Sequence, residues 1–165
     1  MPPRRPIIGV MGSSACDAAT YAKAQRLGEL LAQAGYVVLC GGGTGVMEAV
    51  ARGARAQGGT TIGILPGRDS SESPPNPYIE LPLFTGIFYA RNLMNVLSSD
   101  VVVAVAGGLG TLSEIALALQ CDKPVVRLGS WDFQIAGFER PAHLHEAGTP
   151  EEALERVRAL LASRG

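Results

Sequence analysis

The sequence has few charged residues and no excess of either sign. Charged side chains make up 18% of the 165 residues, and 14 Lys and Arg stand against 15 Asp and Glu, giving a net charge of -1. Domains that bind nucleic acid are normally clearly basic, so this composition argues against nucleic acid as a partner. It also offers no polybasic attraction to membranes. A surface poor in charge favours burial against another subunit, and we expect a homodimer or homotetramer.

Cysteine and long hydrophobic runs are also scarce. The 3 cysteines, Cys16, Cys40 and Cys121, are odd in number and irregularly spaced, which argues against a disulfide framework and favours a reducing compartment. No stretch approaches the ~20 apolar residues that span a membrane. Residues 1–12 contain no apolar segment of signal-peptide length. We therefore expect a cytoplasmic protein without a membrane partner.

The sequence does contain a regular alternation of apolar and amphipathic segments. Near-continuous apolar runs predict buried strands over residues 7–11, 36–40, 60–65, 101–105 and 124–128. A weaker strand over 78–83 contains Pro82, which places it at a sheet edge. Helical patterns occupy residues 17–34, 46–57, 86–99, 111–120 and 150–163. This alternation predicts a doubly wound, mostly parallel Rossmann-like α/β sheet with helices on both faces.

The length of 165 residues corresponds to a single domain, over residues 1–165. We expect residues 1–5 to form a flexible tail and the Pro- and Ser-rich segment 66–78 to form a loop or flap. In sheets of this kind ligands bind at the carboxyl ends of the strands, near the point where the strand order reverses. Three segments expected at that edge are rich in glycine, namely 12–14, 41–45 and 107–111.

Glycine-rich turns from a strand into a helix let backbone N–H groups approach an anion, and they aim the helix N-terminus at it. Two such turns in one sheet predict a site for a phosphorylated small molecule. Glu48 and Ser113 replace the third glycine of a G-x-G-x-x-G pattern, and no P-loop motif is present, which disfavours NAD enzymes and P-loop NTPases. The candidate ligand-binding residues are Gly12, Ser13, Ser14, Gly42, Gly43, Thr44, Gly45, Arg91, Gly107, Gly108, Gly110 and Thr111.

Several of these residues also have a purely structural interpretation. Thr111 and Glu114 have the spacing of a capping box, in which the Glu side chain bonds the backbone at the helix start. Arg91 could equally be a solvated helix residue. Ser13 and Ser14 either donate to a phosphate or cap the helix that follows them.

Other reactive side chains give weaker signals. Cys40 precedes the first glycine turn, where a buried small side chain is expected more than a ligand contact. His143 and His145 resemble a metal-binding pair, but no third ligand is near in sequence, so we expect a surface loop and no metal site. Trp131 and Phe133 follow a predicted strand, and their pattern does not separate site lining, subunit contact and core filling.

The second glycine turn, Ala106-Gly-Gly-Leu-Gly-Thr-Leu-Ser-Glu114, closely resembles PGGxGTxxE, the signature of the LOG proteins. The first turn, Gly41 to Met47, looks like the GGGxxGLM motif of that family, one residue shorter. Beyond these motifs, the chain is similar to the molybdenum-cofactor carrier proteins and their bacterial relatives, which belong to the same Rossmann-like superfamily. That similarity lies in residues 5–12, 58–67 and 113–119, and the resemblance covers roughly residues 5–130.

The two branches imply different functions. LOG enzymes cleave the N-glycosidic bond of nucleoside 5′-monophosphates, and their catalytic Arg and Glu correspond to Arg91 and Glu114. Carriers bind the molybdenum cofactor, also a phosphorylated organic anion, and pass it to a receiving enzyme without chemistry. Ala106 replaces the proline of the enzyme signature, and we favour a carrier that requires no cofactor of its own. A phosphoribohydrolase acting on AMP-like nucleotides and a sensor of a nucleotide signal are the alternatives.

Overall fold

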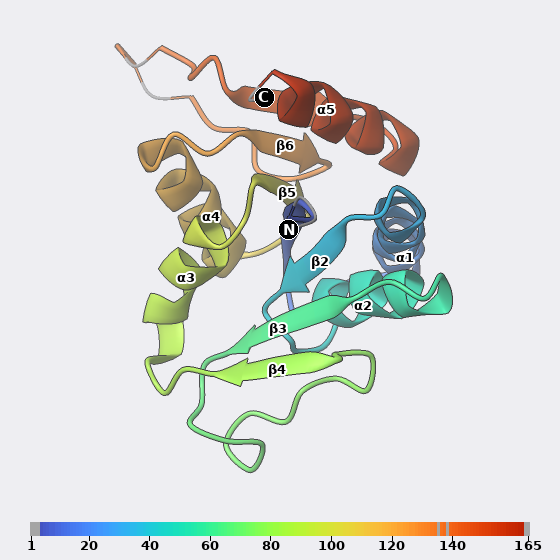
Figure 1. Cartoon of the computed structure of the whole chain (residues 1–165). Coiled ribbons are helices and arrows are strands. Elements are labelled where there is room, and N and C mark those ends of the chain that lie inside the picture. Colours follow the sequence, from blue (N-terminus) through green and yellow to red (C-terminus); the bar gives the residue numbers. More distant parts are fainter. Residues whose placement is uncertain (1–3, 135, 138, 164–165) are drawn as a thin grey trace.

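The computed structural model describes residues 4–134, 136–137 and 139–163 (Figure 1). Its centre is a seven-stranded sheet in the order β4-β3-β2-β1-β5-β6-β7, in which every pairing is parallel. The strands are β1 (Ile7–Gly12), β2 (Val37–Cys40), β3 (Thr61–Leu65), β4 (Leu81–Phe84), β5 (Val101–Val105), β6 (Val125–Leu128) and β7 (Leu144–Ala147). The helices are α1 (Ala18–Gln33), α2 (Val46–Ala56), the 3-10 helix η1 (Phe88–Ala90), α3 (Arg91–Leu97), α4 (Leu109–Gln120) and α5 (Pro150–Ala162). The predicted doubly wound α/β sheet is confirmed.

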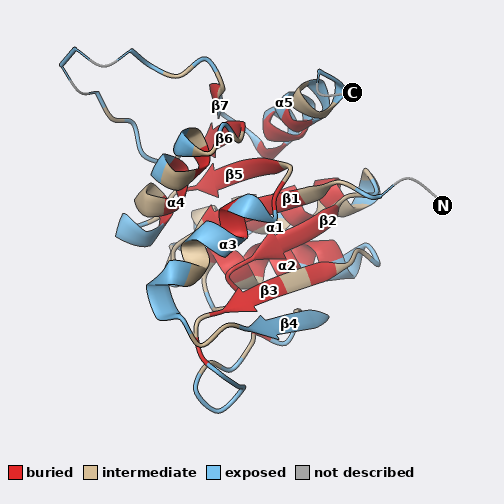
Figure 2. Ribbon diagram, turned by 60° about the vertical axis from the view of Figure 1, so that its left-hand side comes forward, coloured by how far each residue is buried: buried red, intermediate tan, exposed pale blue. Residues whose placement is uncertain are grey.

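Helices cover both faces of the sheet, with α1, α2 and α5 on one side and α3 and α4 on the other (Figure 1). The central strand β5 shows why both faces need cover. Val101, Val103 and Val105 pack into the core on the α1–α2–α5 side. Val102 and Ala104 pack on the α3–α4 side, as the two-residue period of a strand requires. Figure 2 shows β5 and its neighbours buried, whereas β4 at the sheet edge is exposed.

Two elements differ from the sequence-based prediction. The segment around His145 was expected to be a surface loop, which is wrong, because His145 lies in β7 and β7 pairs with β6. This edge strand is held by backbone pairing, and its sequence, LHEA, has no continuous apolar run. The helix predicted over 86–99 is shorter and begins as η1, because Gly86 and Phe88 both have positive φ angles, of 65° and 49°.

The first described residues of the chain are bound to the domain by side-chain contacts. Residues 1–3, part of the predicted tail, lie outside the described residues; Arg4 pairs with Asp100 at 2.7 Å, and Arg5 donates to the Thr60 hydroxyl at 3.1 Å. In the described part of the chain, no helix combines the length and the apolar character that a membrane crossing needs.

Candidate functional site

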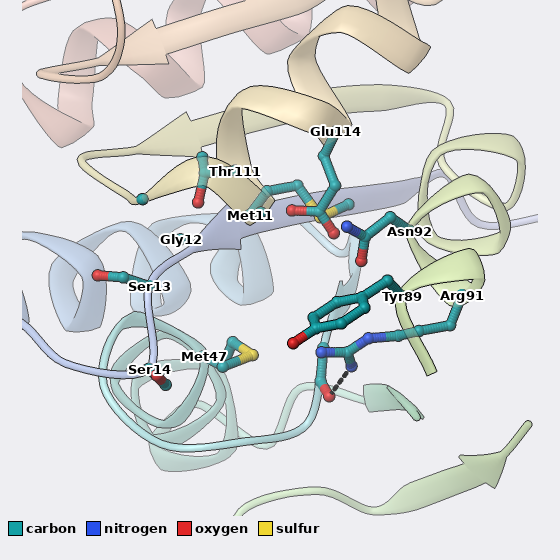
Figure 3. A pocket seen from close by; sticks show the side chains of 13 residues that line it. Met11, Gly12, Ser13, Ser14, Met47, Tyr89, Arg91, Asn92, Thr111 and Glu114 are labelled. Atoms are coloured by element: carbon teal, nitrogen blue, oxygen red, sulfur yellow. Dashed lines mark hydrogen bonds between the residues drawn. The ribbon is translucent and has the colours of Figure 1, made fainter. Parts of the chain in front are cut away.

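A cavity of about 300 Å³ opens at the carboxyl edge of the sheet (Figure 3). It lies beside the ends of β1 and β5, the neighbouring strands between which the strand order reverses. The predicted candidates that line it are Gly12, Ser13, Ser14, Arg91, Gly108, Gly110, Thr111 and Glu114. Met11, Gly41, Met47, Tyr89 and Asn92 complete the lining. The structure therefore brings together residues from four separate segments of the chain.

The second glycine turn directs a helix N-terminus at this cavity. Helix α4 begins at Leu109, two residues before its predicted start, and Gly108 is its N-cap. The first N–H groups of a helix have no partner within the helix. Among the described residues no side chain caps this end of α4 in their place. Gly108, Gly110 and Thr111 line the cavity, so these N–H groups and the partial positive charge of the helix lie at its wall. A helix N-terminus of this kind can bind an anion.

The capping-box interpretation of Glu114 is wrong. Because α4 begins at Leu109, Thr111 is its third residue and not its N-cap, and Glu114 is too far along the helix to reach the N-cap backbone. Glu114 instead accepts a hydrogen bond from Nδ2 of Asn95 in α3, at 2.7 Å from its Oε1. Burial raises the pKa of Glu114 to about 7, although the Asn95 hydrogen bond and the charge of Arg91 lower it. A carboxyl group that titrates near neutral pH is suited to proton transfer.

Arg91 supplies the second positive group of the cavity. Its Nη1 donates to the carbonyl oxygen of Gly41, directly after β2 (Figure 3). The same Nη1 donates to the carbonyl oxygen of Ile64 in β3. Burial lowers the pKa of Arg91 below its usual range, and the charge of Glu114 opposes this effect. The interpretation of Arg91 as a solvated helix residue is therefore wrong. The guanidinium is held in the cavity wall, where it can bind phosphate or ribose oxygens.

The first glycine turn supports the cavity and contributes only Gly41 to its lining. The candidates that stay outside the lining are Gly42, Gly43, Thr44, Gly45 and Gly107. Thr44 Oγ1 donates to the carbonyl oxygen of Ser14 at 2.8 Å. A Cβ added at Gly45 would lie 2.5 Å from the carbonyl oxygen of Ser13, so this close approach requires glycine. The turn thereby positions the Ser13–Ser14 segment, which does line the cavity.

Two polar side chains fix the segments around this turn. Asp17 is the N-cap of α1 and accepts from the backbone N–H of Thr20 at 2.7 Å, so the expected alternative that Ser13 or Ser14 caps this helix is wrong. The buried side chain of Asn76 donates to the Gly43 carbonyl oxygen at 2.8 Å. Asn76 thereby attaches the irregular segment 66–78 to the first glycine turn.

Sequence reasoning missed four side chains that line the cavity, Met11, Met47, Tyr89 and Asn92. Tyr89 is 89% exposed, and Figure 3 shows its ring reaching over the cavity with its hydroxyl group toward Met47. Met47 and Met11 supply the apolar part of the wall. A signal was present for Tyr89, because it stands two residues before Arg91 in the segment that resembles the LOG proteins. The methionines carry no such signal, since their positions also fit a core.

The remaining reactive residues lie outside this cavity. Cys40 is fully buried, as predicted, and burial raises the pKa of its thiol to about 11. The ring Nε2 of His143 lies 3.2 Å from the Leu119 carbonyl oxygen. Throughout the described ranges, no three His, Cys, Asp or Glu side chains are grouped so that they could hold a metal ion. Trp131 Nε1 donates to the Gly108 carbonyl oxygen at 3.0 Å, and Phe133 packs against the core on the α3–α4 side.

The chain is similar in sequence and structure to several known proteins. The model of the SLOG cluster4 family matches residues 5–154. The molybdenum cofactor binding protein from Rippkaea orientalis is 38% identical, with a TM-score of 0.84 over 96% of this chain and 98% of that chain. The Moco carrier protein from Chlamydomonas reinhardtii is also 38% identical, with a TM-score of 0.84 over 97% of this chain and 99% of that one. The cytokinin riboside 5′-monophosphate phosphoribohydrolase of Mycobacterium tuberculosis is 30% identical over 66% of this chain and 62% of its own length.

Proposed function

The chain belongs to the SLOG cluster4 family, and on that premise we propose that it binds and carries a phosphorylated, pterin-like or nucleotide-like small molecule. The family match confirms the predicted membership of the LOG-like Rossmann superfamily. The molybdenum cofactor is the first candidate ligand. Two solved structures that resemble this chain over nearly their whole length are of proteins described as binding or carrying that cofactor.

One observation carries this proposal. The uncapped N-terminus of α4 and the guanidinium of Arg91 face the same cavity from different elements. Both favour a negatively charged group, and the helix N-terminus suits a phosphate in particular. Tyr89, Met11 and Met47 add apolar walls, on which a planar ring can pack. The donor set therefore fits a ring system that carries a phosphate, and both the cofactor and a nucleotide have this composition.

The backbone at Ala106 supports a carrier over an enzyme of the LOG type. Ala106 has a φ angle of +46°, whereas the proline of the enzyme signature is restricted to a φ angle near about -65°. The turn in this chain therefore has a conformation that the signature sequence cannot adopt. As a carrier, the protein would act in the cytoplasm as a homo-oligomer and transfer its cargo to a receiving enzyme.

A phosphoribohydrolase is the second candidate, and the position of Glu114 favours it. Glu114 lines the cavity together with Arg91, and its pKa of about 7 lets it hold or release a proton near neutral pH. When a base leaves a nucleotide, positive charge develops on the sugar, and a carboxylate can stabilise this charge or orient the attacking water. The chain thus retains both groups that such a reaction requires.

Identification of the bound molecule tests the carrier function. The protein would be purified from cells that synthesise molybdenum cofactor and then denatured. The small molecules that it releases would be analysed by mass spectrometry. We expect a phosphorylated pterin. Release of no phosphorylated compound, together with no binding of added AMP or molybdenum cofactor, would contradict the proposal.

Incubation with AMP separates the carrier from the hydrolase. Wild type and Glu114→Gln would be assayed for free adenine, since the Gln side chain can still accept the Asn95 hydrogen bond. We expect no adenine from either protein. Release by wild type that falls at least ~100-fold in Glu114→Gln would establish the hydrolase instead, since positioned acid–base groups contribute at least that factor.

A further inference from the structure

A second cavity, of about 310 Å³, lies on the other side of the second glycine turn. It is lined by Ala106, Gly107, Gly129, Ser130 and Trp131. The first cavity is lined by later residues of the same turn and by the ends of β1 and β2. The second is lined by residues that follow β5 and β6. The two cavities therefore adjoin the same glycine turn before α4, the first toward the ends of β1 and β2 and the second toward the ends of β5 and β6.

Trp131 gives the second cavity a fixed aromatic surface. Its indole Nε1 donates to the Gly108 carbonyl oxygen at 3.0 Å, which holds the ring against the glycine turn. Its carbonyl oxygen accepts from Nη1 of Arg127 at 2.5 Å. Arg127 is only 2% exposed and extends from β6, so it provides a rigid anchor. Trp131 nevertheless remains 36% exposed as a residue, and its ring can stack on a ligand.

The turn between the cavities is held in an unusual conformation. Ala106 and Gly107 have φ angles of +46° and +106°, and such a backbone is unfavourable for alanine. The Ser130 hydroxyl donates to the Ala106 carbonyl oxygen at 2.5 Å, which ties this conformation to the segment after β6. The same segment that carries Trp131 therefore also fixes the turn that presents the α4 N-terminus.

We propose that the second cavity takes the second planar ring of a two-part ligand. Doubly wound sheets bind dinucleotides across the point where the strand order reverses, with the pyrophosphate at a helix N-terminus. Here the pyrophosphate would lie at the N-terminus of α4, one ring would lie in the first cavity beneath Tyr89, and the other would stack on Trp131. The ligand class is two planar ring systems joined by a pyrophosphate, such as a dinucleotide form of a pterin cofactor. This inference rests on the proposed function.

Fluorescence tests the inference directly, because the sequence contains a single tryptophan, Trp131. The probes are ADP-ribose and P1,P2-diadenosine diphosphate, which share the pyrophosphate diester and differ in the second adenine. We expect the second compound to quench Trp131 and to bind at least about fivefold more tightly, as stacking of one base predicts. ADP-ribose should bind without comparable quenching.

Variants distinguish stacking from a bracing role of Trp131. Affinities would be measured by calorimetry, so that they do not depend on the tryptophan signal. Both variants lose the Nε1 hydrogen bond to Gly108, so they differ only in the aromatic face. Trp131→Leu should remove the advantage of the second adenine, whereas Trp131→Phe should retain most of that advantage. Tyr89→Leu is the matched control in the first cavity and should weaken both probes equally.

The outcomes separate this inference from the proposed function. Binding of ADP-ribose with no gain from the second adenine would overturn the two-part site and leave the proposed function standing. Equal weakening of both probes by Trp131→Leu would also overturn it, since the residue would then only brace the turn. Binding of neither probe would contradict the inference and also count against the proposed function.

Discussion

Asn95 and Glu114 form a buried hydrogen bond between α3 and α4, with 2.7 Å between Nδ2 and Oε1. Glu114 is 7% exposed and Asn95 is 0% exposed. The amide donates a single hydrogen bond, which compensates only partly for the removal of a carboxylate from water. This imbalance explains why the pKa of Glu114 rises to about 7 although a cation, Arg91, is close enough to lower it.

We expect Glu114→Gln to stabilise the protein at alkaline pH. The pKa of Glu114 is about 7 in the folded protein and 4.5 in the unfolded chain. The folded state therefore binds more protons between these values, and wild type loses stability as the pH rises through this window. At pH 8 the variant should be more stable by on the order of 3 kcal/mol, from 1.36 kcal/mol per pKa unit. At pH 4 the two proteins should be equally stable.

Urea unfolding at pH 4, 6 and 8 measures this difference. Glu151→Gln is the control of opposite sign. The hydrogen bond from Arg26 lowers the pKa of the Glu151 carboxyl, so this variant should lose stability relative to wild type as the pH rises. A stability difference between Glu114→Gln and wild type that stays constant across the three pH values would refute a shifted Glu114.

The central fold could be predicted from the sequence because its signals are local. The strand over Val101–Val105 is a continuous apolar run, and its observed bounds equal the predicted ones. The glycine turns were predictable for the same reason, since a strand, a glycine cluster and a helical pattern follow one another. The strand β7 gave no local signal, because it is short and polar and is defined by its pairing with β6.

The cavity was only partly predictable, because its wall depends on contacts between distant segments. Glu114 was a candidate from its motif, but its partner Asn95 lies 19 residues away on another helix. Helix α4 starts two residues early without a capping side chain, so the sequence offered Thr111 as a false N-cap. Asn76 and Trp131 reach the glycine turns from irregular segments, whose paths side-chain patterns do not specify.

Gly108→Val should block ligand binding without unfolding the protein. A Cβ added at Gly108 meets no atom within 4 Å, and its φ angle of -101° is open to any residue. The new side chain would therefore occupy the space at the α4 N-terminus where an anion is expected. We predict a loss of affinity of at least about tenfold, or ~1.4 kcal/mol. The free energy of unfolding should change by less than about 1 kcal/mol.

Ligand titration and urea unfolding of the same preparation provide both values. Gly45→Ala is the matched control, because its Cβ would lie 2.5 Å from the Ser13 carbonyl oxygen and should destabilise the fold. Unchanged affinity in folded Gly108→Val would exclude the α4 N-terminus as the anion site.

We expect this chain to associate through the apolar surface formed by β4, η1 and α3. Figure 2 shows that these elements are largely exposed, although their sequences are apolar. The large hydrophobic side chains on this surface are Leu81, Leu83, Phe84, Ile87, Phe88, Tyr89, Leu93, Met94 and Leu97. Exposed apolar side chains gathered on neighbouring elements mark a protein interface, so Leu93→Asp combined with Leu97→Asp should produce a monomer. Sedimentation velocity decides the question, with Arg158→Asp on α5 as the control. A wild-type monomer at high micromolar concentration would refute the association.

Ala106 should tolerate glycine and reject proline. Its φ angle of +46° costs alanine about 1 kcal/mol relative to an ordinary backbone, and glycine avoids most of this cost. Ala106→Gly should therefore raise the free energy of unfolding by roughly 0.5 kcal/mol after the larger loss of chain entropy. Ala90→Gly is the control, because Ala90 has a φ angle of -64° and gains nothing from glycine.

Ala106→Pro should destabilise the protein by about 3 kcal/mol or more, because the ring fixes φ near about -65°. It also removes the N–H that donates to the Leu128 carbonyl oxygen at 3.4 Å. Thermal and urea unfolding of Ala106→Gly, Ala106→Pro and Ala90→Gly test the order of stability. This order of stability would show that Ala106, the one difference from the enzyme signature in the second glycine turn, cannot be replaced by proline without changing the backbone around it. A fully stable Ala106→Pro variant would show that the turn also adopts the conformation of the enzymes, and it would remove Ala106 as an argument for the carrier.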